Sequence, residues 1–251
     1  MSTILYLMPG VGAGVEEKAR RQRIASGFLT NPANTVVVDD VDEGPVSIES
    51  SIEGDLSVRG TLRKLIALKG RYDAVIVGCG DDPGLFSVRE LMDVPVVGPF
   101  ESSVAVASMV GDRFSLITTS LECIPETRMI LRKYGAEGRC ASIRAVDVTV
   151  DELIDGRAGR ERIVEAFSRE ARLAVKDGAS CITMGCMSMA FMLLDEAVRD
   201  TIPAPVINPA KVAVKVAEML VSLGLKHSVL AYPKPDFAKL RRTVLPELQT
   251  E

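Results

Sequence analysis

The sequence of 251 residues contains few of the groups on which common enzyme classes depend. It has one histidine, His227, and no tryptophan. A Ser-His-Asp site or a histidine-rich metal site would have to be built around that single imidazole. Because His227 lies beside Lys226 after the last helical pattern, we interpret it as a solvated residue of the C-terminal tail. The sequence therefore disfavours histidine chemistry, and we expect no metal site.

Concentrated charge and long apolar runs are also absent. The sequence contains 30 Lys and Arg residues against 34 Asp and Glu residues, a net charge of −4, without a block of one sign. Nucleic-acid binding requires a concentrated basic face, so we expect no nucleic-acid partner. No apolar stretch reaches the roughly 18 residues of a membrane-spanning helix. The first apolar run follows no basic segment and is interpreted as a strand, so we expect a cytoplasmic protein that binds no membrane.

The cysteines have no pattern typical of a structural role. Five are present, an odd number, and no two of them form a C-x-x-C pair. This spacing disfavours both a disulfide framework and a structural zinc site. Free thiols are typical of proteins in a reducing cytosol. With histidine so scarce, thiols become the candidate catalytic groups, and the cysteines are Cys79, Cys123, Cys140, Cys181 and Cys186.

Short runs rich in β-branched residues alternate with amphipathic segments along the sequence. The expected strands are Thr3–Met8, Thr35–Val38, Ala74–Cys79, Pro95–Gly98, Arg113–Thr118, Ala141–Val146, Ser180–Gly185 and Pro205–Asn208. Helical periodicity lies between them, for example in Val15–Leu29, Leu56–Leu68 and Arg160–Lys176. Strands that alternate with helices predict parallel sheets covered on both faces.

The expected strands form two sets of four, and each strand of the first set recurs about 110 residues later. The segment Ala74–Cys79 ends like Cys181–Cys186, and Pro95–Pro99 resembles Pro205–Pro209. Chance likeness between Val- and Ile-rich strands explains one such match. It does not explain four strands in register, which indicate an internal repeat.

This repeat predicts an α/β fold of two similar domains, each with a four-stranded parallel sheet, related by a pseudo-two-fold axis. The expected first domain comprises residues 1–98 plus 209–251, and the second comprises residues 99–208. In open parallel sheets, ligands bind beyond the carboxyl ends of the strands. Cys79 and Cys186 each end a strand of the repeat, so we expect the two thiols to face each other across one interdomain cleft.

The residues after these strands favour reactive thiols. A cysteine directly before a helix lies in the positive field of the helix N-terminus, which predicts a lowered pKa for both thiols. The turn after Cys79 contains Asp81 and Asp82, either of which could cap a following helix. Two thiols on opposite faces of a bound carbon acid make a two-base isomerase, in which one takes the α-proton and the other protonates the opposite face. Such a site requires no metal, no pyridoxal phosphate and no histidine.

Other interpretations of the same residue types remain open. A buried cysteine is more often a small apolar side chain of the core than a catalytic group, and we keep this interpretation for Cys123, Cys140 and Cys181. The hydroxyls of Thr118 and Thr119 would suit a substrate carbonyl or carboxylate. Equally, the two threonines are β-branched strand residues with capping hydroxyls.

Several segments resemble the Asp/Glu/hydantoin racemase superfamily, and hydantoin and allantoin racemases in particular. The segments that carry the resemblance are Cys79–Leu85 with Arg89–Glu90 and Pro95–Gly98, Gly44–Glu49, Gly111–Thr119 and Gly185–Met189. The likeness extends in order from about Gly44 to Val221, and the first-cysteine segment is its most specific part.

The resemblance implies two flavodoxin-like domains, homo-oligomers, and racemisation without a cofactor, with Cys79 and Cys186 as the paired acid and base. The loops that contact the ligand in this family correspond here to Pro9, Gly10, Gly80, Asp81, Thr118, Thr119 and Met187. The sequence departs from the family at Met8–Gly12, where an Asn-Pro-Asn-Thr-like loop is usual. Polar side-chain donors are replaced there by backbone N–H groups.

We therefore expect a cofactor-independent racemase that acts at the α-carbon of a hydantoin-like small molecule. An aspartate- or glutamate-type amino-acid racemase and a related isomerase or decarboxylase remain as alternatives on the same scaffold. An amino-acid substrate would need polar groups for its free α-carboxylate and its side chain, and the loop Pro9–Gly14 supplies few. An alternative of another class is a non-catalytic binding protein for small molecules with the same two lobes.

Overall fold

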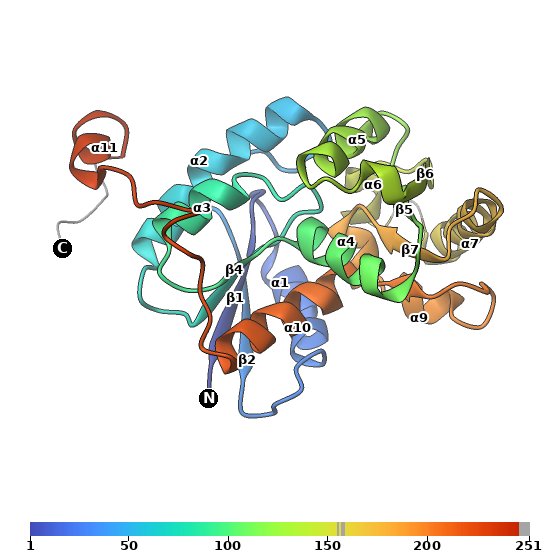
Figure 1. Ribbon diagram of the computed structural model, residues 1–251, viewed down its shortest axis with the longest axis horizontal. Coiled ribbons are helices and arrows are strands. Elements are labelled where there is room, and N and C mark those ends of the chain that lie inside the picture. The colour runs from blue at the N-terminus through green and yellow to red at the C-terminus, as the bar shows by residue number, and fades with distance from the viewer. Residues whose placement is uncertain (155, 157–158, 246–251) are drawn as a thin grey trace.

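The computed structural model describes residues 1–154, 156 and 159–245, whose strands form two parallel sheets (Figure 1). The first sheet has the order β2-β1-β3-β4 and contains β1 (Thr3–Met8), β2 (Thr35–Asp40), β3 (Ala74–Val77) and β4 (Val96–Val97). The second has the order β6-β5-β7-β8 and contains β5 (Phe114–Thr118), β6 (Cys140–Ala145), β7 (Cys181–Met184) and β8 (Val206–Ile207). The two orders are identical once each strand is matched to its repeat. The predicted α/β fold of two equivalent four-stranded parallel sheets is confirmed.

Helices connect the strands and cover both faces of each sheet. They are α1 (Val15–Ser26), α2 (Ser51–Ala67), α3 (Leu85–Leu91), α4 (Pro99–Val110), α5 (Cys123–Lys133), α6 (Val150–Ile154), α7 (Arg160–Lys176), α8 (Met187–Phe191), α9 (Leu194–Val198), α10 (Pro209–Ser222), α11 (Phe237–Thr243) and a 3-10 helix at Glu137–Arg139. The helix α7 has the predicted bounds, whereas α2 begins before the predicted Leu56. Its first turn holds no buried apolar residue, so the apolar periodicity of the core-facing side does not reveal it. Glu53 stabilises that turn by accepting hydrogen bonds from the Glu49 N–H (2.9 Å) and the Ser50 hydroxyl (2.7 Å).

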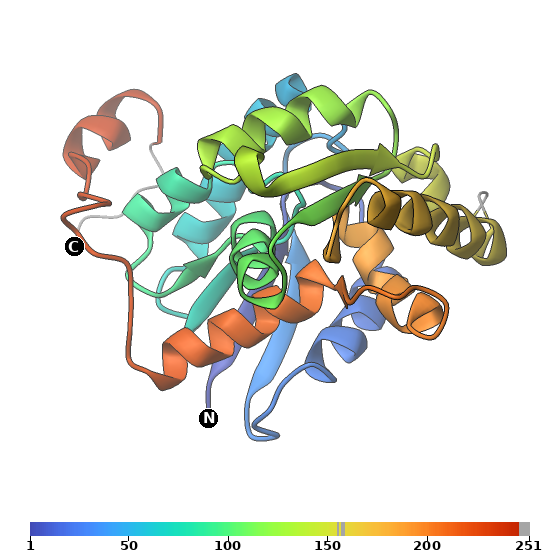
Figure 2. The same ribbon diagram turned by 45° about the vertical axis from the view of Figure 1, so that its right-hand side comes forward.

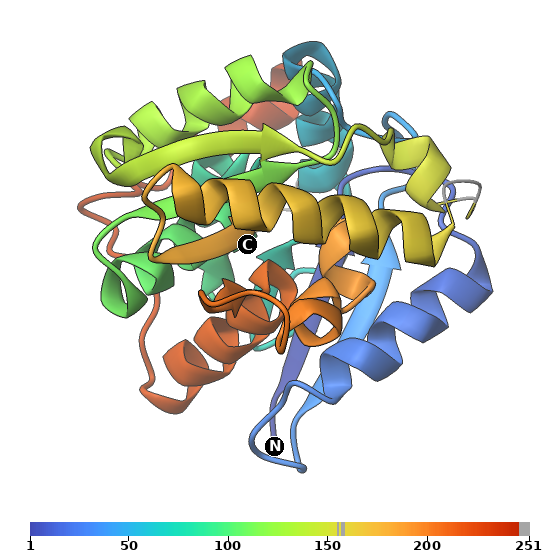
Figure 3. The ribbon, with the colours of Figure 1, turned by 90° about the vertical axis from the view of Figure 1, so that its right-hand side faces the viewer.

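The central strand β1 is buried on both faces. Ile4 and Tyr6 pack with α1 and α10 on one face, whereas Leu5 and Leu7 pack with α2 and α3 on the other. This double burial explains why the strand is a continuous apolar run rather than an alternating pattern. In the second sheet, α7 crosses one face and buries Phe167 against β7 (Figure 3).

The helix that follows each of the edge strands β4 and β8 packs against the other sheet, not against the sheet of its own strand. The helix α4 follows β4 but contacts β7 and β8, whereas α10 follows β8 and returns to β1, β3 and β4. The two helices also pack against each other (Figure 2). Beyond α10, Phe237 and Leu240 pack against the core of the first sheet. These contacts support the expected division after residues 98 and 208, which we propose as the domain boundaries.

Asp82, in the loop after β3, ties the first domain to the second. Its carboxylate accepts hydrogen bonds from the N–H groups of Phe100 (3.0 Å) and Glu101 (2.8 Å) in the first turn of α4, and from the Tyr134 hydroxyl (2.9 Å). The side chain is fully buried, and this burial raises the pKa of Asp82 to about 7. The expected capping of the next helix is wrong, because α3 begins at Leu85 without a side-chain cap and Asp82 caps α4 instead.

Replacement of Asp82 by alanine is expected to lower the free energy of unfolding by about 2 to 4 kcal/mol. The change leaves two backbone donors and the Tyr134 hydroxyl without their acceptor. It also places alanine at a φ of 48°, which aspartate and asparagine tolerate better. Urea unfolding measures the difference, and Asp82→Asn, which keeps one acceptor oxygen, should lose less. An alanine variant as stable as the wild type would contradict this linking role.

The interpretation of His227 as a solvated tail residue is wrong. The imidazole is half-buried beside the Tyr232 ring, and its Nε2 accepts a hydrogen bond from the Val96 N–H (2.8 Å) on the edge strand β4. Burial, followed by the charge of Arg89, lowers the pKa of His227 and keeps the ring neutral. The segment after α10 therefore covers a backbone donor at the open edge of the first sheet.

Candidate active site

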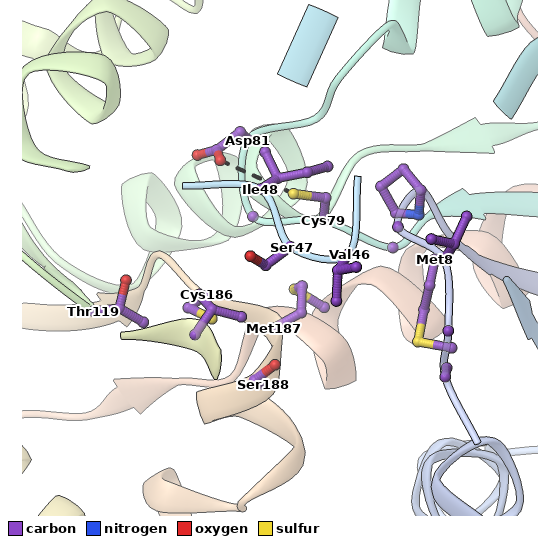
Figure 4. A pocket seen from close by; sticks show the side chains of 18 of the residues that line it. Met8, Val46, Ser47, Ile48, Cys79, Asp81, Thr119, Cys186, Met187 and Ser188 are labelled. Atoms are coloured by element: carbon purple, nitrogen blue, oxygen red, sulfur yellow. Dashed lines mark hydrogen bonds between the residues drawn. The ribbon is translucent and has the colours of Figure 1, made fainter. Parts of the chain in front are cut away.

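The loops that follow the strands of both sheets enclose a cavity of about 190 Å³. Its lining includes all the residues expected to contact a ligand: Pro9, Gly10, Gly80, Asp81, Thr118, Thr119 and Met187. Cys79 and Cys186 also line it, from the loops after β3 and β7 (Figure 4). The structure thus brings residues from the carboxyl ends of equivalent strands to one place, where ligands of open parallel sheets bind.

The first cysteine loop is held against the core by the residue before it. Gly78 lies on the ring of Tyr6, whose hydroxyl donates a hydrogen bond to the Gly78 carbonyl (3.2 Å). Any side chain at Gly78 would overlap that ring. Cys79 follows, with 4.0 Å between its Sγ and Oδ2 of Asp81 (dashed line in Figure 4). The loop therefore places the Cys79 thiol in the cavity wall beside a carboxyl group.

The second cysteine begins the short helix α8. Cys186 is the N-cap residue and makes no side-chain capping hydrogen bond, but the N–H groups of Met189 and Ser188 in the first turn favour its ionised form. Met187, Ala190 and Phe191 of α8 belong to the core of the first sheet. The Phe191 ring packs edge-on against Tyr6, with 5.3 Å between the ring centres. The loop of the second domain is thus anchored in the first.

The two cysteine loops contact each other through glycines. A Cβ atom at Gly80 would lie far inside van der Waals distance of the Gly185 carbonyl oxygen. A Cβ at Gly185 would in turn come within 3.3 Å of the Cβ of Thr118. Only glycine allows the backbones to approach this closely, and the approach brings the adjacent thiols of Cys79 and Cys186 to one small cavity.

Burial dominates the acidity of both thiols. It raises the pKa of Cys186 above its ordinary value, and that of Cys79 well above it. Near Cys79, Asp81 raises the pKa further, whereas near Cys186 the N–H groups of Met189 and Ser188 lower it. The lowered pKa predicted from the helix termini is therefore wrong, because the loss of water around a thiolate outweighs the field of the short helix.

Asp81 is a carboxyl group in an unusual setting. Its hydrogen-bond partner among the described residues is the Cys79 thiol. Burial, followed by the charges of Glu126 and Asp82, raises the pKa of Asp81 to about 8. The group is therefore mostly protonated at neutral pH, and above its pKa it becomes an anion that disfavours a thiolate on Cys79.

The helix α1 adds two charged residues to the lining that the sequence did not reveal, Glu17 and Arg21. Arg21 donates hydrogen bonds from Nε to Glu17 Oε1 (2.7 Å) and from Nη2 to Ser188 Oγ (3.2 Å). A Glu–Arg pair at this helical spacing usually lies on an exposed face. Arg21 is only 6 % exposed because α8, which is distant in sequence, packs over it.

The interpretation of Cys123 as a core residue is also wrong. It is the first residue of α5 and is half-buried in the cavity lining. Its Sγ lies 3.6 Å from Thr119 Oγ1 and 3.4 Å from Ser120 Oγ. Cys181 is fully buried, as expected, whereas Cys140 is half-buried on β6.

Apolar residues complete the wall. Val46 and Ile48, with Ser47 between them, line the cavity beside Cys79 (Figure 4), and Val150 joins them from the second domain. Val46, Ser47 and Ile48 belong to Gly44–Glu49, which carried the family resemblance but had no ligand-binding role assigned to it. The cavity is therefore mainly apolar, with thiols, hydroxyls and two charged residues at defined points.

Two classes of feature are not found in the part of the chain that the structure describes. Over residues 1–154, 156 and 159–245, no three His, Cys, Asp or Glu side chains are grouped as metal ligands. No helix in the same ranges has both the length and the apolar character needed to cross a membrane.

Comparison with known proteins identifies the class to which this fold and thiol-lined cavity belong. The family model Asp/Glu/Hydantoin racemase matches residues 7–217. The hydantoin racemase of Rhizobium meliloti is 34% identical over 219 residues, 85% of this chain and 89% of the relative. The allantoin racemase of Pseudomonas fluorescens superimposes with a TM-score of 0.82 at 29% identity, covering 93% of this chain and 97% of that chain. The chain belongs to the Asp/Glu/hydantoin racemase family of enzymes.

Proposed function

We propose that the protein is a cofactor-independent racemase of a five-membered cyclic ureide, such as a 5-substituted hydantoin or allantoin. The observation that carries this proposal is the pair of thiols, Cys79 and Cys186, on equivalent loops of the two repeated sheets around one cavity. The relatives named as hydantoin and allantoin racemases support the substrate class. The family as a whole supports the reaction type.

In the proposed reaction, one cysteine acts as a thiolate and the other as a thiol. The thiolate removes the proton from the α-carbon of the ureide, and the electron pair of the C–H bond moves into an enolate. Backbone N–H groups of the cavity loops stabilise the enolate oxygen. The opposite thiol then donates its proton to the other face of the carbon, which inverts the configuration. Solvent proton exchange between the thiols restores the starting state.

The cavity favours a compact ring over a free amino acid. Its volume of about 190 Å³ lies below the roughly 300 to 1,000 Å³ of sites for drug-sized ligands. The loop Met8–Gly12 offers backbone groups, which suit the carbonyl and N–H groups of a neutral ureide. An amino-acid racemase or a decarboxylase would have to hold a free carboxylate in this mainly apolar space. Those activities, and a non-catalytic binding role, stay as alternatives for the test.

Chiral chromatography of single enantiomers tests the substrate class. We expect the protein to convert either enantiomer of a 5-substituted hydantoin or of allantoin to the racemate without added cofactor, faster than a protein-free control. Aspartate and glutamate should remain unchanged. Racemisation of the amino acids but not of the ureides would contradict the proposed substrate, and inertness toward all of them would contradict a racemase.

Racemase activity is expected to rise with pH between about 7 and 9. The reactive form needs one thiolate, and burial raises the pKa of both Cys79 and Cys186. Because both values are raised, the thiolate fraction is small at neutral pH and increases about tenfold per unit below the first pKa. A pH profile of kcat/KM measures this rise, after correction for spontaneous racemisation. A rate that is constant or falls over this range would contradict the assigned thiols.

We also retain two further predictions for this chain, namely that it forms homo-oligomers and acts in the cytoplasm. The subunit count is measured by light scattering of the purified protein.

A further inference from the structure

The surroundings of the two thiols differ in charge, and the difference begins with Arg21. This guanidinium is buried between the Phe191 ring, 5.1 Å from its centre, and the hydroxyl of Ser188. The N–H of the same Ser188 lies in the first turn of α8 and favours the ionised form of Cys186. Arg21 thus holds the turn that carries the N–H donors for Cys186 and adds its own positive charge.

The charge of Arg21 is only partly neutralised. Glu17, its carboxylate partner, also accepts two hydrogen bonds from Arg20, from Nε to Oε2 (2.6 Å) and from Nη2 to Oε1 (2.7 Å). Arg21 shares Oε1 through one hydrogen bond. One carboxylate therefore serves two guanidinium groups, and a positive excess remains on the Cys186 side of the cavity.

The Cys79 side has the opposite character. The charged groups that act on the Cys79 sulfur are the carboxyls of Asp81 and Asp82 together with the Cys186 thiol. The charge of Glu126, a further carboxyl from α5, raises the pKa of Asp81. A negative charge on Cys79 would therefore form among acidic groups, whereas one on Cys186 would form beside a buried cation.

We propose that Cys186 is the thiol that ionises first and that Arg21 is the positioning residue that stabilises its thiolate, whereas the Asp81 carboxyl, once ionised, opposes a thiolate on Cys79. This inference rests on the proposed two-thiol mechanism for its role in turnover. It assigns Cys186 as the base in the resting enzyme and Cys79 as the acid. The enantiomer whose α-hydrogen faces Cys186 then meets the more easily ionised of the two thiols.

The groups that face each sulfur agree with this assignment. For Cys186 they are the Ser188 and Met189 N–H groups and Arg21, which favour the anion, opposed by Asp81 and by burial. For Cys79, burial, the Asp81 carboxyl and Asp82 disfavour the anion, and the backbone N–H of Asp81 opposes them.

Alkylation of each cysteine by iodoacetamide, followed by mass spectrometry between about pH 7 and 11, tests the assignment without any substrate. The midpoint pH of each site is compared, because it is independent of how accessible the site is. We expect a midpoint for Cys186 at least about one unit below that of Cys79. Arg21→Met should raise the Cys186 midpoint and slow its alkylation about fivefold to tenfold at a fixed pH below the midpoint.

Three matched variants complete the experiment. Arg21→Lys keeps the positive charge and should keep the low midpoint of Cys186. Arg23→Met removes an exposed cation from the same helix and should leave the midpoints of both cysteines unchanged. Asp81→Asn should lower the midpoint of Cys79 and so reduce the difference between the midpoints of the two cysteines. If Arg21→Met does not fold, the lysine and Asp81→Asn variants carry the test.

The proposal would be overturned if the midpoint of Cys79 in the wild type were equal to or lower than that of Cys186. An Arg21→Met variant in which the midpoint of Cys186 is unchanged would also overturn it. An Asp81→Asn variant with the same difference between the two midpoints as the wild type would overturn the role of Asp81. Alkylation requires no turnover. Different midpoints in a protein that racemises no ureide would therefore leave this inference standing and reject the proposed function.

Discussion

Replacement of Cys79 or Cys186 by serine is expected to lower racemisation of a hydantoin by about a thousandfold or more. A serine hydroxyl is a much weaker acid than a thiol and cannot serve as either the base or the proton donor at neutral pH. General acid–base groups of this kind contribute about 10²- to 10⁴-fold each. Chiral chromatography of both enantiomers measures the loss.

The two serine variants should also differ from each other. Each retains one thiol, so each is expected to exchange the α-proton of one enantiomer with solvent, and the two variants should act on opposite enantiomers. Cys140→Ser, on β6, is the matched control and should retain full activity. Wild-type racemisation by either active-site variant would contradict the two-thiol mechanism.

Replacement of Gly80 by alanine is expected to reduce activity about a hundredfold or more, since a displacement of about 1 Å at a reacting group has effects of this size. The added methyl group would occupy the place of the Gly185 carbonyl oxygen, and two backbones cannot yield as a flexible side chain can. The cysteine loops must then separate, which moves both thiols away from a shared substrate carbon. Steady-state kinetics of the folded variant measures the loss.

Gly138→Ala is the control for this substitution. No atom lies within 4 Å of a Cβ built at Gly138, and the residue has no left-handed backbone conformation, so the variant should match the wild type. Wild-type activity of Gly80→Ala would show that the contact between the loops does not position the thiols.

The internal repeat made the architecture predictable from the sequence. Matched strand ends at Cys79 and Cys186 identified the equivalent strands, and the shared sheet order follows from them. The strand pattern was clear because the inner strands β1, β3, β5 and β7 are buried along nearly their whole length and are mostly apolar. Helix starts were less predictable, as at α2, whose first turn holds no buried apolar residue and is stabilised by Glu53 rather than by core packing.

Features that depend on contacts between distant segments were not predictable. Asp82 caps α4, which begins in the chain well after the adjacent helix α3. Arg21 lines the cavity because α8 packs over α1, although its spacing from Glu17 is that of an ordinary surface pair. The acidity of the thiols likewise depends on contacts between distant segments. A helix start is visible in the sequence, whereas the burial that outweighs it is set by the whole fold.

The central claim is that two thiols act on opposite faces of one carbon, and deuterium incorporation tests it most directly. A single enantiomer of the hydantoin is converted in deuterated water, and both enantiomers are separated by chiral chromatography at early conversion and analysed by mass spectrometry. Two separate bases predict deuterium in the product enantiomer while the remaining starting enantiomer keeps its protium. Protium carried into the product, or equal deuterium in both enantiomers, would show a single base that serves both faces and would contradict the account.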